Sequence, residues 1–410
     1  MDFSENLKRG AASPEHGRAP RVLFYSHDTF GLGHLRRSRT MAAALTASDE
    51  QMSAMIITGS PVAGRFTFPE RVDYVRLPGV TKRSDGSYVS EKLGFDVEET
   101  TVIRAGLIKA LVKLFVPDII VVDKEPTGFR GELRPALEWL HKSGNSKLIL
   151  GLRDVLDGPE LLAEEWERKG AAEAMEKYYD EIWVYGLKSV YDPTDGLDLP
   201  EQVRKRMIWT GYLRRESTAR AELPDQPYIL VTPGGGGDGK AMVDQVLLAY
   251  EKDPALKPAA LLVYGPFLTG DVRSDFERRV AELDGRVMSV GFDSRMESLM
   301  AGAAGVVAMG GYNTFCEILS CDVPAVIVPR TVPRLEQYIR ASRAEQLGLV
   351  RMFDKKLDGS SVDSMIEVIR NLPSQKPPSS GRYAGLLGGL DCIVDRTRAL
   401  LTQELEAEEA

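Results

Sequence analysis

The chain has 410 residues, of which 43% are hydrophobic and 27% charged, and its formal net charge is −8. A chain of this length can bury large cores and is expected to form two or three domains, with a composition ordinary for a soluble globular protein. Because the net charge is negative, nucleic acid is not predicted as a partner. No apolar run reaches the roughly 20 residues that cross a bilayer.

The first 20 residues and the cysteines favour a cytoplasmic protein. Residues 1–20 mix Gly, Ala, Ser and Pro with basic side chains and lack the apolar core of a signal peptide, so they are predicted to be a disordered tail. Cys316, Cys321 and Cys392 form no CxxC pair and do not cluster with histidine. They are expected to be reduced core thiols, and no metal site is predicted.

Strands and helices alternate through the first half of the chain. Apolar runs predict strands at residues 21–26, 54–58, 74–77, 118–123, 147–150 and 181–185. Helices are predicted at residues 38–46, 102–115, 133–141 and 160–178, and the polar segment 81–90 carries turn signals. This alternation predicts one doubly wound, Rossmann-like α/β domain over residues 21–210.

A glycine-rich turn joins the first strand to the first helix. Gly31 and Gly33 precede His34, which is expected at or just inside the helix start, and Arg36 and Arg37 follow. Open α/β sheets bind ligands at such turns. The alternative is a tight turn followed by a solvated basic helix face.

The helix at residues 102–115 is mostly apolar, with Arg104, Lys109 and Lys113 dispersed along it. Basic amphipathic helices bind anionic headgroups, so this helix could face a membrane surface. The alternative is a helix buried against the sheet.

The second half repeats the α/β pattern and predicts a second domain over residues 211–378. Strands are predicted at residues 228–232, 260–264, 287–290, 306–309 and 324–328, and helices at 240–250, 271–283, 296–302 and 336–347. Residues 372–381 are rich in Pro and Ser and are expected to be a linker. The last segment, 379–410, carries a predicted helix at 390–406.

The loop at residues 233–239 reads PGGGGDG and matches two phosphate-binding patterns only in part. A P-loop needs Ser or Thr after its lysine to hold magnesium, and Ala241 stands there. A dinucleotide fold needs an acid after the next strand, but that strand ends in Gly265 and Pro266. Successive N–H groups that form an anion-binding concavity remain the expectation. The alternative, a plain strand-to-helix turn, does not need four consecutive glycines.

Residues 305–337 combine a buried run, the turn Gly310 and Gly311, and a helix that carries Glu317. Glycines let a backbone approach closely, and the N–H groups of a helix start favour phosphate. A carboxylate repels phosphate, so Glu317 is better suited to neutral hydroxyls such as a ribose diol. This segment resembles the donor-binding half of GT-B glycosyltransferases, most closely family 28, which includes the N-acetylglucosaminyltransferase of peptidoglycan lipid precursor synthesis.

The resemblance implies two Rossmann-like domains that face a central cleft, with the C-terminal helix crossing back to the first domain. It also implies a metal-independent hexosyltransferase without a cofactor, whose donor is a nucleotide diphosphate-sugar, UDP-linked, and whose acceptor hydroxyl attacks with inversion. Two alternatives stay open, since fold does not fix function: a UDP-sugar epimerase or hydrolase, and a non-catalytic nucleotide-sugar-binding protein.

The resemblance also implies donor contacts. Glu317 matches a glutamate that holds the ribose hydroxyls, Gln337 a glutamine that contacts the donor sugar or diphosphate, and Glu336 stands where the family usually has another glutamine. The implied donor-binding residues are Gly234, Gly235, Gly236, Gly237, Arg215, Phe292, Met296, Gly310, Gly311, Asn313, Thr314, Glu317, Glu336 and Gln337. The turn GLGH resembles the family's GxGGH-like turn, which implies acceptor contacts from Gly31, Gly33, Arg36 and Arg37.

His34 is the predicted general base, because an unperturbed imidazole pKa of about 6.5 lies near neutral pH. It could instead hold substrate or cap the helix. Asp123 is the second predicted catalytic residue, and Glu125 and Asp28 are further candidate bases near strand ends. The acceptor is either lipid-linked, with the protein peripheral at the inner membrane face, or a small soluble molecule.

Overall fold

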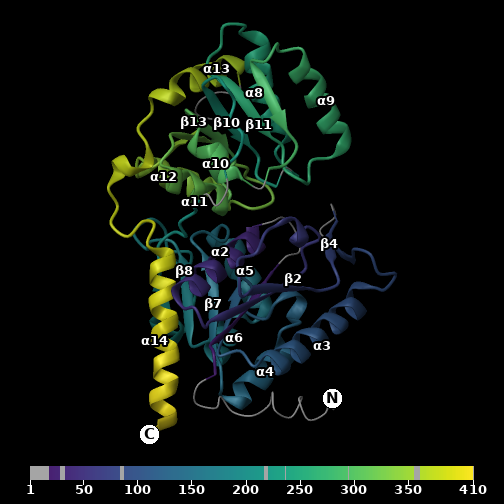
Figure 1. Ribbon diagram of the computed structural model, residues 1–410, viewed down its shortest axis with the longest axis vertical. Helices are drawn as coiled ribbons and strands as arrows, with labels where there is room; N and C mark the ends of the chain where they lie inside the picture. The colour runs from purple at the N-terminus through teal and green to yellow at the C-terminus, as the bar shows by residue number, and fades with distance from the viewer. Residues whose placement is uncertain are drawn as a thin grey trace.

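The computed structural model describes residues 18–27, 33–83, 87–216, 220–235, 237–293, 295–354 and 361–409. Two α/β bodies lie one above the other, and a long C-terminal helix runs beside the first of them (Figure 1). The predicted fold class is confirmed by two separate parallel sheets of seven and six strands. Most of the predicted tail, residues 1–17, lies outside the described residues.

The first sheet has seven strands in the order β3-β2-β1-β6-β7-β8-β9. Its strands are β1 (Arg21–Ser26), β2 (Ser53–Thr58), β3 (Val72–Arg76), β6 (Ile119–Asp123), β7 (Lys147–Arg153), β8 (Glu181–Tyr185) and β9 (Met207–Trp209). Every residue of β6 and β8 is buried, as expected for parallel strands covered on both faces, and this is why they read as continuous apolar runs. The strand order reverses between β1 and β6, so ligands are expected at their carboxyl ends.

Helices cover this sheet on both sides. They are α2 (Gly33–Ser48), α3 (Val97–Phe115), α4 (Arg134–Ser143), α5 (Pro159–Lys169), α6 (Ala171–Tyr178) and α7 (Glu201–Lys205), with short 3-10 turns at Ala63–Arg65 and Phe129–Gly131. The single helix predicted at 160–178 is wrong in one respect: Gly170, with a φ of 62°, ends α5 and starts α6. The polar segment 81–90 includes parts of a two-stranded hairpin, β4 (Val80–Lys82) and β5 (Tyr88–Ser90), which the turn signals did not predict.

The second sheet has six parallel strands in the order β12-β11-β10-β13-β14-β15. Its strands are β10 (Tyr228–Thr232), β11 (Ala259–Val263), β12 (Val287–Val290), β13 (Gly305–Ala308), β14 (Ala325–Ile327) and β15 (Arg351–Met352). Its helices are α8 (Lys240–Lys252), α9 (Gly270–Ala281), α10 (Met296–Ala301), α11 (Tyr312–Cys321), α12 (Glu336–Gln346) and α13 (Val362–Asn371). Here the order reverses between β10 and β13.

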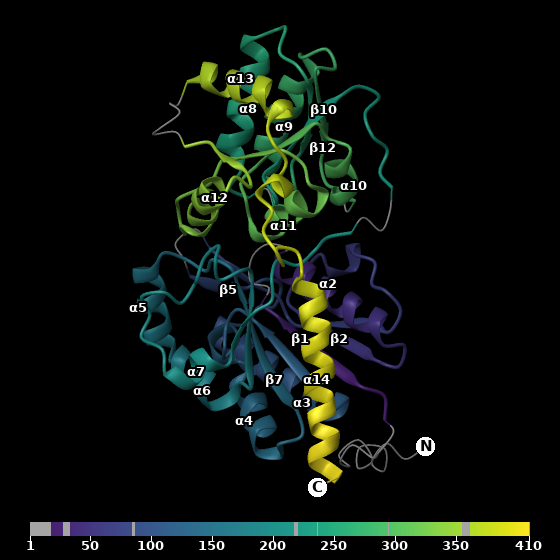
Figure 2. The same ribbon diagram turned by 90° about the vertical axis from the view of Figure 1, so that its left-hand side faces the viewer.

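The C-terminal helix α14 (Gly389–Glu409) packs on the first domain, as predicted (Figure 2). The linker contains 3-10 turns at Leu372–Ser374 and Pro378–Gly381. The segment that follows it passes close to Gly211, where a Cβ atom would lie 2.5 Å from the carbonyl oxygen of Gly385. Arg398 Nη2 then donates to the carbonyl oxygen of Ser48 at 3.0 Å. The exact domain boundaries at residues 210, 378 and 379 stay predictions.

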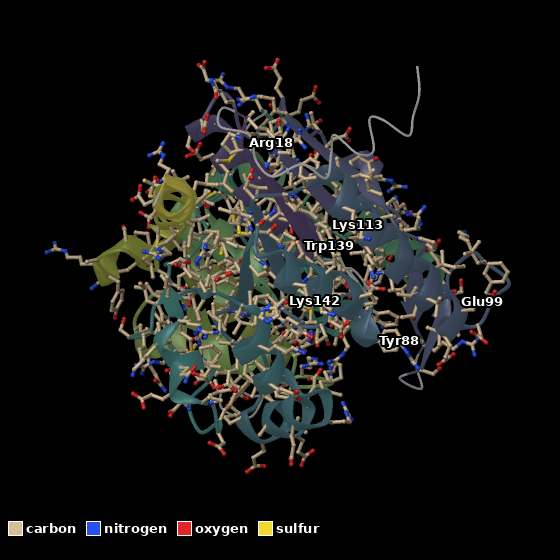
Figure 3. All side chains as sticks on the ribbon, turned by 90° about the horizontal axis from the view of Figure 1, so that it is seen from below. Arg18, Tyr88, Glu99, Lys113, Trp139 and Lys142 are labelled. Carbon is tan, nitrogen blue, oxygen red and sulfur yellow. The ribbon has the colours of Figure 1, made fainter. Side chains whose placement is uncertain are left out.

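Helix α3 has one buried and one exposed face. Arg104 is buried and donates to Glu132, which places this arginine inside the domain. Val102 is 72% exposed, and Leu107 and Leu114 are also exposed. Lys113, Trp139 and Lys142 lie at the same end of the first domain, away from the second (Figure 3). Within the described ranges, no helix is long and apolar enough to cross a membrane.

Candidate functional site

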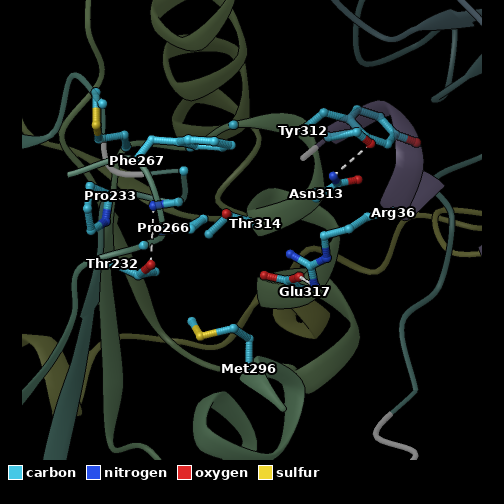
Figure 4. Close-up of a pocket in the computed structure, with 18 of the residues that line it drawn as sticks. Arg36, Thr232, Pro233, Pro266, Phe267, Met296, Tyr312, Asn313, Thr314 and Glu317 are labelled. Carbon is cyan, nitrogen blue, oxygen red and sulfur yellow. Dashed lines mark hydrogen bonds and ion pairs between the residues drawn. The ribbon is translucent and has the colours of Figure 1, made fainter. Parts of the chain in front are cut away.

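A cleft lies between the two domains, where the carboxyl ends of both sheets face each other (Figure 4). Most of the predicted site residues line it: Gly33, His34, Arg36, Arg37, Gly234, Gly235, Gly237, Phe292, Met296, Gly310, Gly311, Asn313, Thr314, Glu317 and Gln337. Asp123, Arg215 and Glu336 do not line the cleft but contact residues that do. Gly31, Gly236 and Asp28 lie outside the described residues.

The glycine loop after β10 is supported from behind. Gly234 has a φ of 73°, and its N–H donates to Thr232 Oγ1 at 3.2 Å. Gly265 packs so closely that a Cβ atom there would lie 2.3 Å from the carbonyl oxygen of Gly234, and the N–H of Phe267 donates to the carbonyl oxygen of Gly235 at 3.0 Å. This backing fixes the loop at the edge of the sheet where its order reverses.

The start of α11 faces the same space. Gly310 has a φ of 76°, and a Cβ atom there would lie 2.6 Å from Ile327, so this position requires glycine. The first helical amides, from Tyr312 to Thr314, have no partner four residues earlier within the helix and carry the positive end of its dipole. A helix start and a glycine loop therefore line the same cleft, and this arrangement suits an anion.

Glu317 is 1% exposed and lies one turn into α11. Its carboxylate is paired with Arg36 of the first domain (Figure 4), and the same guanidinium group donates to Glu297 Oε1 at 2.9 Å. Burial raises the pKa of Glu317, while the charge of Arg36 opposes this rise. Arg36, predicted as an acceptor contact, therefore lies at the carboxylate predicted to hold the ribose.

His34 and Asp123 form a hydrogen-bonded pair on the first domain. His34 Nδ1 lies 2.7 Å from Asp123 Oδ2, and Arg37 Nη2 lies 2.6 Å from the same oxygen. Burial disfavours the charge of Asp123, but Arg37 and His34 outweigh burial and hold its pKa well below the usual range. An ionised Asp123 accepts a hydrogen bond from Nδ1–H of His34, so Nε2 is the ring nitrogen that would exchange a proton with a ligand.

Arg215 ties the two domains together next to the cleft. Its guanidinium contacts Thr40 of α2, and its Nη2 donates to Asn313 Oδ1 at 2.7 Å. Asn313 Nδ2 in turn donates to the carbonyl oxygen of Gly33 at 3.0 Å. These contacts fix the start of α2 against the start of α11.

Residues 229–381 match the glycosyltransferase family 28 C-terminal domain. The match spans most of the second domain. The GT-B fold of the whole chain agrees with this match, and the protein is a glycosyltransferase that uses a nucleotide-sugar donor. The sequence matched none of the curated proteins with which it was compared.

Solved structures share the fold along nearly the whole chain. The calicheamicin glycosyltransferase CalG4 is 16% identical with a TM-score of 0.58, and the match covers 94% of this chain and 99% of CalG4. MurG of Acinetobacter baumannii is 12% identical with a TM-score of 0.59, over 93% of this chain and 99% of MurG. A UDP-glucosyltransferase of Polygonum tinctorium is 15% identical with a TM-score of 0.60, over 93% and 94%.

Two arginines of this glycosyltransferase line the cleft although the sequence did not single them out. Arg153 ends β7, three residues beyond the predicted strand, and its Nη2 donates to Glu336 Oε2 at 2.7 Å. Arg330 follows β14, and its Nη2 donates to Glu336 Oε1 at 3.0 Å. Burial disfavours the charge of Glu336, but the nearby positive charges of Arg153, Arg340 and Arg330 lower its pKa to about 2. In the sequence both arginines follow apolar runs that predict buried strands, and this position was the signal that could have identified them.

The described parts of the chain contain no group of three His, Cys, Asp or Glu side chains that could hold a metal ion. Among the described residues, the basic side chains that line the cleft are arginines from both domains and His34.

Proposed function

We propose that the protein transfers a hexosyl group from a UDP-linked donor to an acceptor hydroxyl, with inversion and without a metal ion. The observation that carries this proposal is that one cleft has suitable donor-binding groups on one side and a candidate base on the other. Anion-binding amides and Glu317 lie on the second domain, and the His34–Asp123 pair lies on the first.

The donor would lie along the edge of the second sheet. Phe292 and Met296 line the part of the cleft proposed for the base, and the glycine loop and the start of α11 line the part proposed for the diphosphate. Glu317 accepts hydrogen bonds from the ribose diol, which requires its carboxylate to exchange Arg36 for hydroxyl groups. Gln337 contacts the transferred sugar.

The chemistry needs a base and a stabilised leaving group. His34 Nε2 removes the proton of the acceptor hydroxyl, and Asp123 stabilises the imidazolium that forms. The acceptor oxygen bonds to the anomeric carbon as the bond to the diphosphate breaks on the opposite face, which inverts that carbon. The negative charge that grows on the diphosphate meets the amides of the glycine loop and of α11.

We further propose that the acceptor is lipid-linked and that the protein works in the cytoplasm, at the inner membrane face. Val102, Leu107 and Leu114 form an exposed apolar face on α3, and Lys113 lies beside it. Apolar side chains flanked by lysine suit an anionic membrane surface. Sedimentation with anionic vesicles should capture the full chain, and a Val102→Asp, Leu107→Asp variant should stay in the supernatant.

The transferase proposal is tested in two steps with the full chain. UDP at 100 times its dissociation constant should add about 2.7 kcal/mol to the free energy of unfolding, measured by thermal shift. UDP-sugars are then incubated with and without acceptor extracts, and the products are separated by chromatography. Sugar transfer that depends on an acceptor supports the proposal. Free sugar or an epimer formed without any acceptor would identify a hydrolase or an epimerase instead.

A further inference from the structure

One corner of the cleft holds two arginines that the proposed mechanism leaves without a role. Arg153 comes from the end of β7 in the first domain, and Arg330 follows β14 in the second. Both line the cleft, as does Gln337, whose Oε1 accepts from the N–H of Arg330 at 3.1 Å.

The strand order places this corner beyond the diphosphate. Phe292 follows β12, the glycine loop follows β10, Gly310 follows β13 and Arg330 follows β14. These strands lie in the order β12-β11-β10-β13-β14 and are parallel, so their carboxyl ends share one edge. A donor whose base lies at β12 and whose diphosphate lies between β10 and β13 therefore directs its sugar toward β14.

The side chains of Arg153 and Arg330 are partly buried, and two acidic side chains face them. Arg153 and Arg330 share one buried carboxylate, that of Glu336. The other acidic partner of Arg330 is Asp238, whose side chain is 36% exposed and is screened by solvent. The Nε atoms of both arginines are buried and have no hydrogen-bond partner among the described residues. An additional acceptor with negative charge would satisfy these donors.

We propose that Arg153 and Arg330 bind a carboxylate on the transferred sugar, so that the donor is a UDP-linked uronic acid. This inference rests on the proposed function. A guanidinium group presents two parallel N–H donors that match both oxygens of a carboxylate, whereas a neutral hexose offers only uncharged acceptors to these donors. Because the two arginines come from different domains, the sugar carboxylate would also join the domains over the donor.

The test compares the affinities of UDP, UDP-glucose and UDP-glucuronate for the full chain by calorimetry. UDP-glucuronate should bind at least about tenfold more tightly than UDP-glucose, the ratio expected for a charge-assisted hydrogen bond. Arg153→Met should reduce this ratio to below about threefold, while Arg153→Lys should give an intermediate value because lysine keeps the charge without the fork.

Arg334→Met is the matched control. Arg334 also forms an interdomain ion pair, to Asp157 at 3.1 Å, but it does not line the cleft. This variant should keep the preference for UDP-glucuronate. An equal loss of the preference for UDP-glucuronate in Arg153→Met and Arg334→Met would show that only the orientation of the domains matters. A loss of affinity for UDP itself in Arg153→Met would assign that arginine to the diphosphate. Either result overturns the inference. Equal binding of UDP-glucose and UDP-glucuronate overturns it while the proposed function stands, whereas absence of UDP binding refutes the proposed function itself.

Discussion

Replacing Glu317 with glutamine tests the proposed ribose contact. The substitution keeps the shape of the side chain and removes its charge. A hydrogen bond to a charged group contributes about 1.5–3 kcal/mol, and the glutamine amide retains one acceptor. We therefore expect the loss of about one such bond, which corresponds to a rise in the dissociation constant of UDP of about 10- to 150-fold.

Glu297→Gln is the matched control for this experiment. Both carboxylates contact Arg36, but only Glu317 lines the cleft. Each variant leaves Arg36 with one acidic partner, so both should disturb the interdomain contact to a similar degree. Calorimetry with UDP should show less than about a threefold change for Glu297→Gln. Equal losses in the two variants would refute the ribose contact and attribute the effect to release of Arg36.

Three further predictions concern the base, the pH dependence and the core. His34→Ala should lower kcat by about 10²- to 10⁴-fold while the UDP dissociation constant stays within threefold, measured by steady-state kinetics and calorimetry; a change confined to KM would indicate a binding role. The pKa of Glu336 is lowered to about 2, so its contribution to stability is complete above its unfolded pKa of about 4.5 and is lost as the pH falls toward 2. The free energy of unfolding, measured by urea titration at pH 5 and pH 3, should therefore change less with pH for Glu336→Gln than for the unmodified chain. An equal change in both proteins would contradict this. Arg104→Met should lower the free energy of unfolding by about 3–5 kcal/mol, because the charge of Glu132 is left buried without its ion-pair partner. The double variant Arg104→Met, Glu132→Leu should recover most of that loss in denaturant titrations. A loss below about 1 kcal/mol in the single variant would contradict the argument.

The sequence predicted the bounds of most strands and helices closely, but it read the starts of α2 and α3 too late. The bounds of β1 and β10 agree with their apolar runs because parallel strands buried on both faces require such runs. The helical pattern was read from residue 38 because the first turn of α2 is polar, but the helix starts at Gly33, which agrees with the expectation that His34 lies at or just inside the helix start. Its polar side chains contact Asp123 and the second domain, which periodicity cannot show.

The site was predicted as a set of residues but not as a set of contacts. Glycine turns after buried strands indicated where a ligand would bind, and the structure brings those turns to one cleft. The ion pair between Arg36 and Glu317 joins residues 281 positions apart, on two domains. Likewise, nothing local distinguishes Arg153 and Arg330, which line the cleft, from Arg215, which lies behind it. Such differences depend on how the two domains pack.

A crystal structure of the full chain soaked with UDP tests the central claim most directly. We predict density in the interdomain cleft, with the ribose hydroxyls within hydrogen-bonding distance of Glu317, the diphosphate at the amides of Gly234, Gly235, Gly237 and of α11, and Arg36 displaced from Glu317. Nucleotide bound elsewhere, or an empty cleft with the Arg36–Glu317 pair intact at millimolar UDP, would contradict the account.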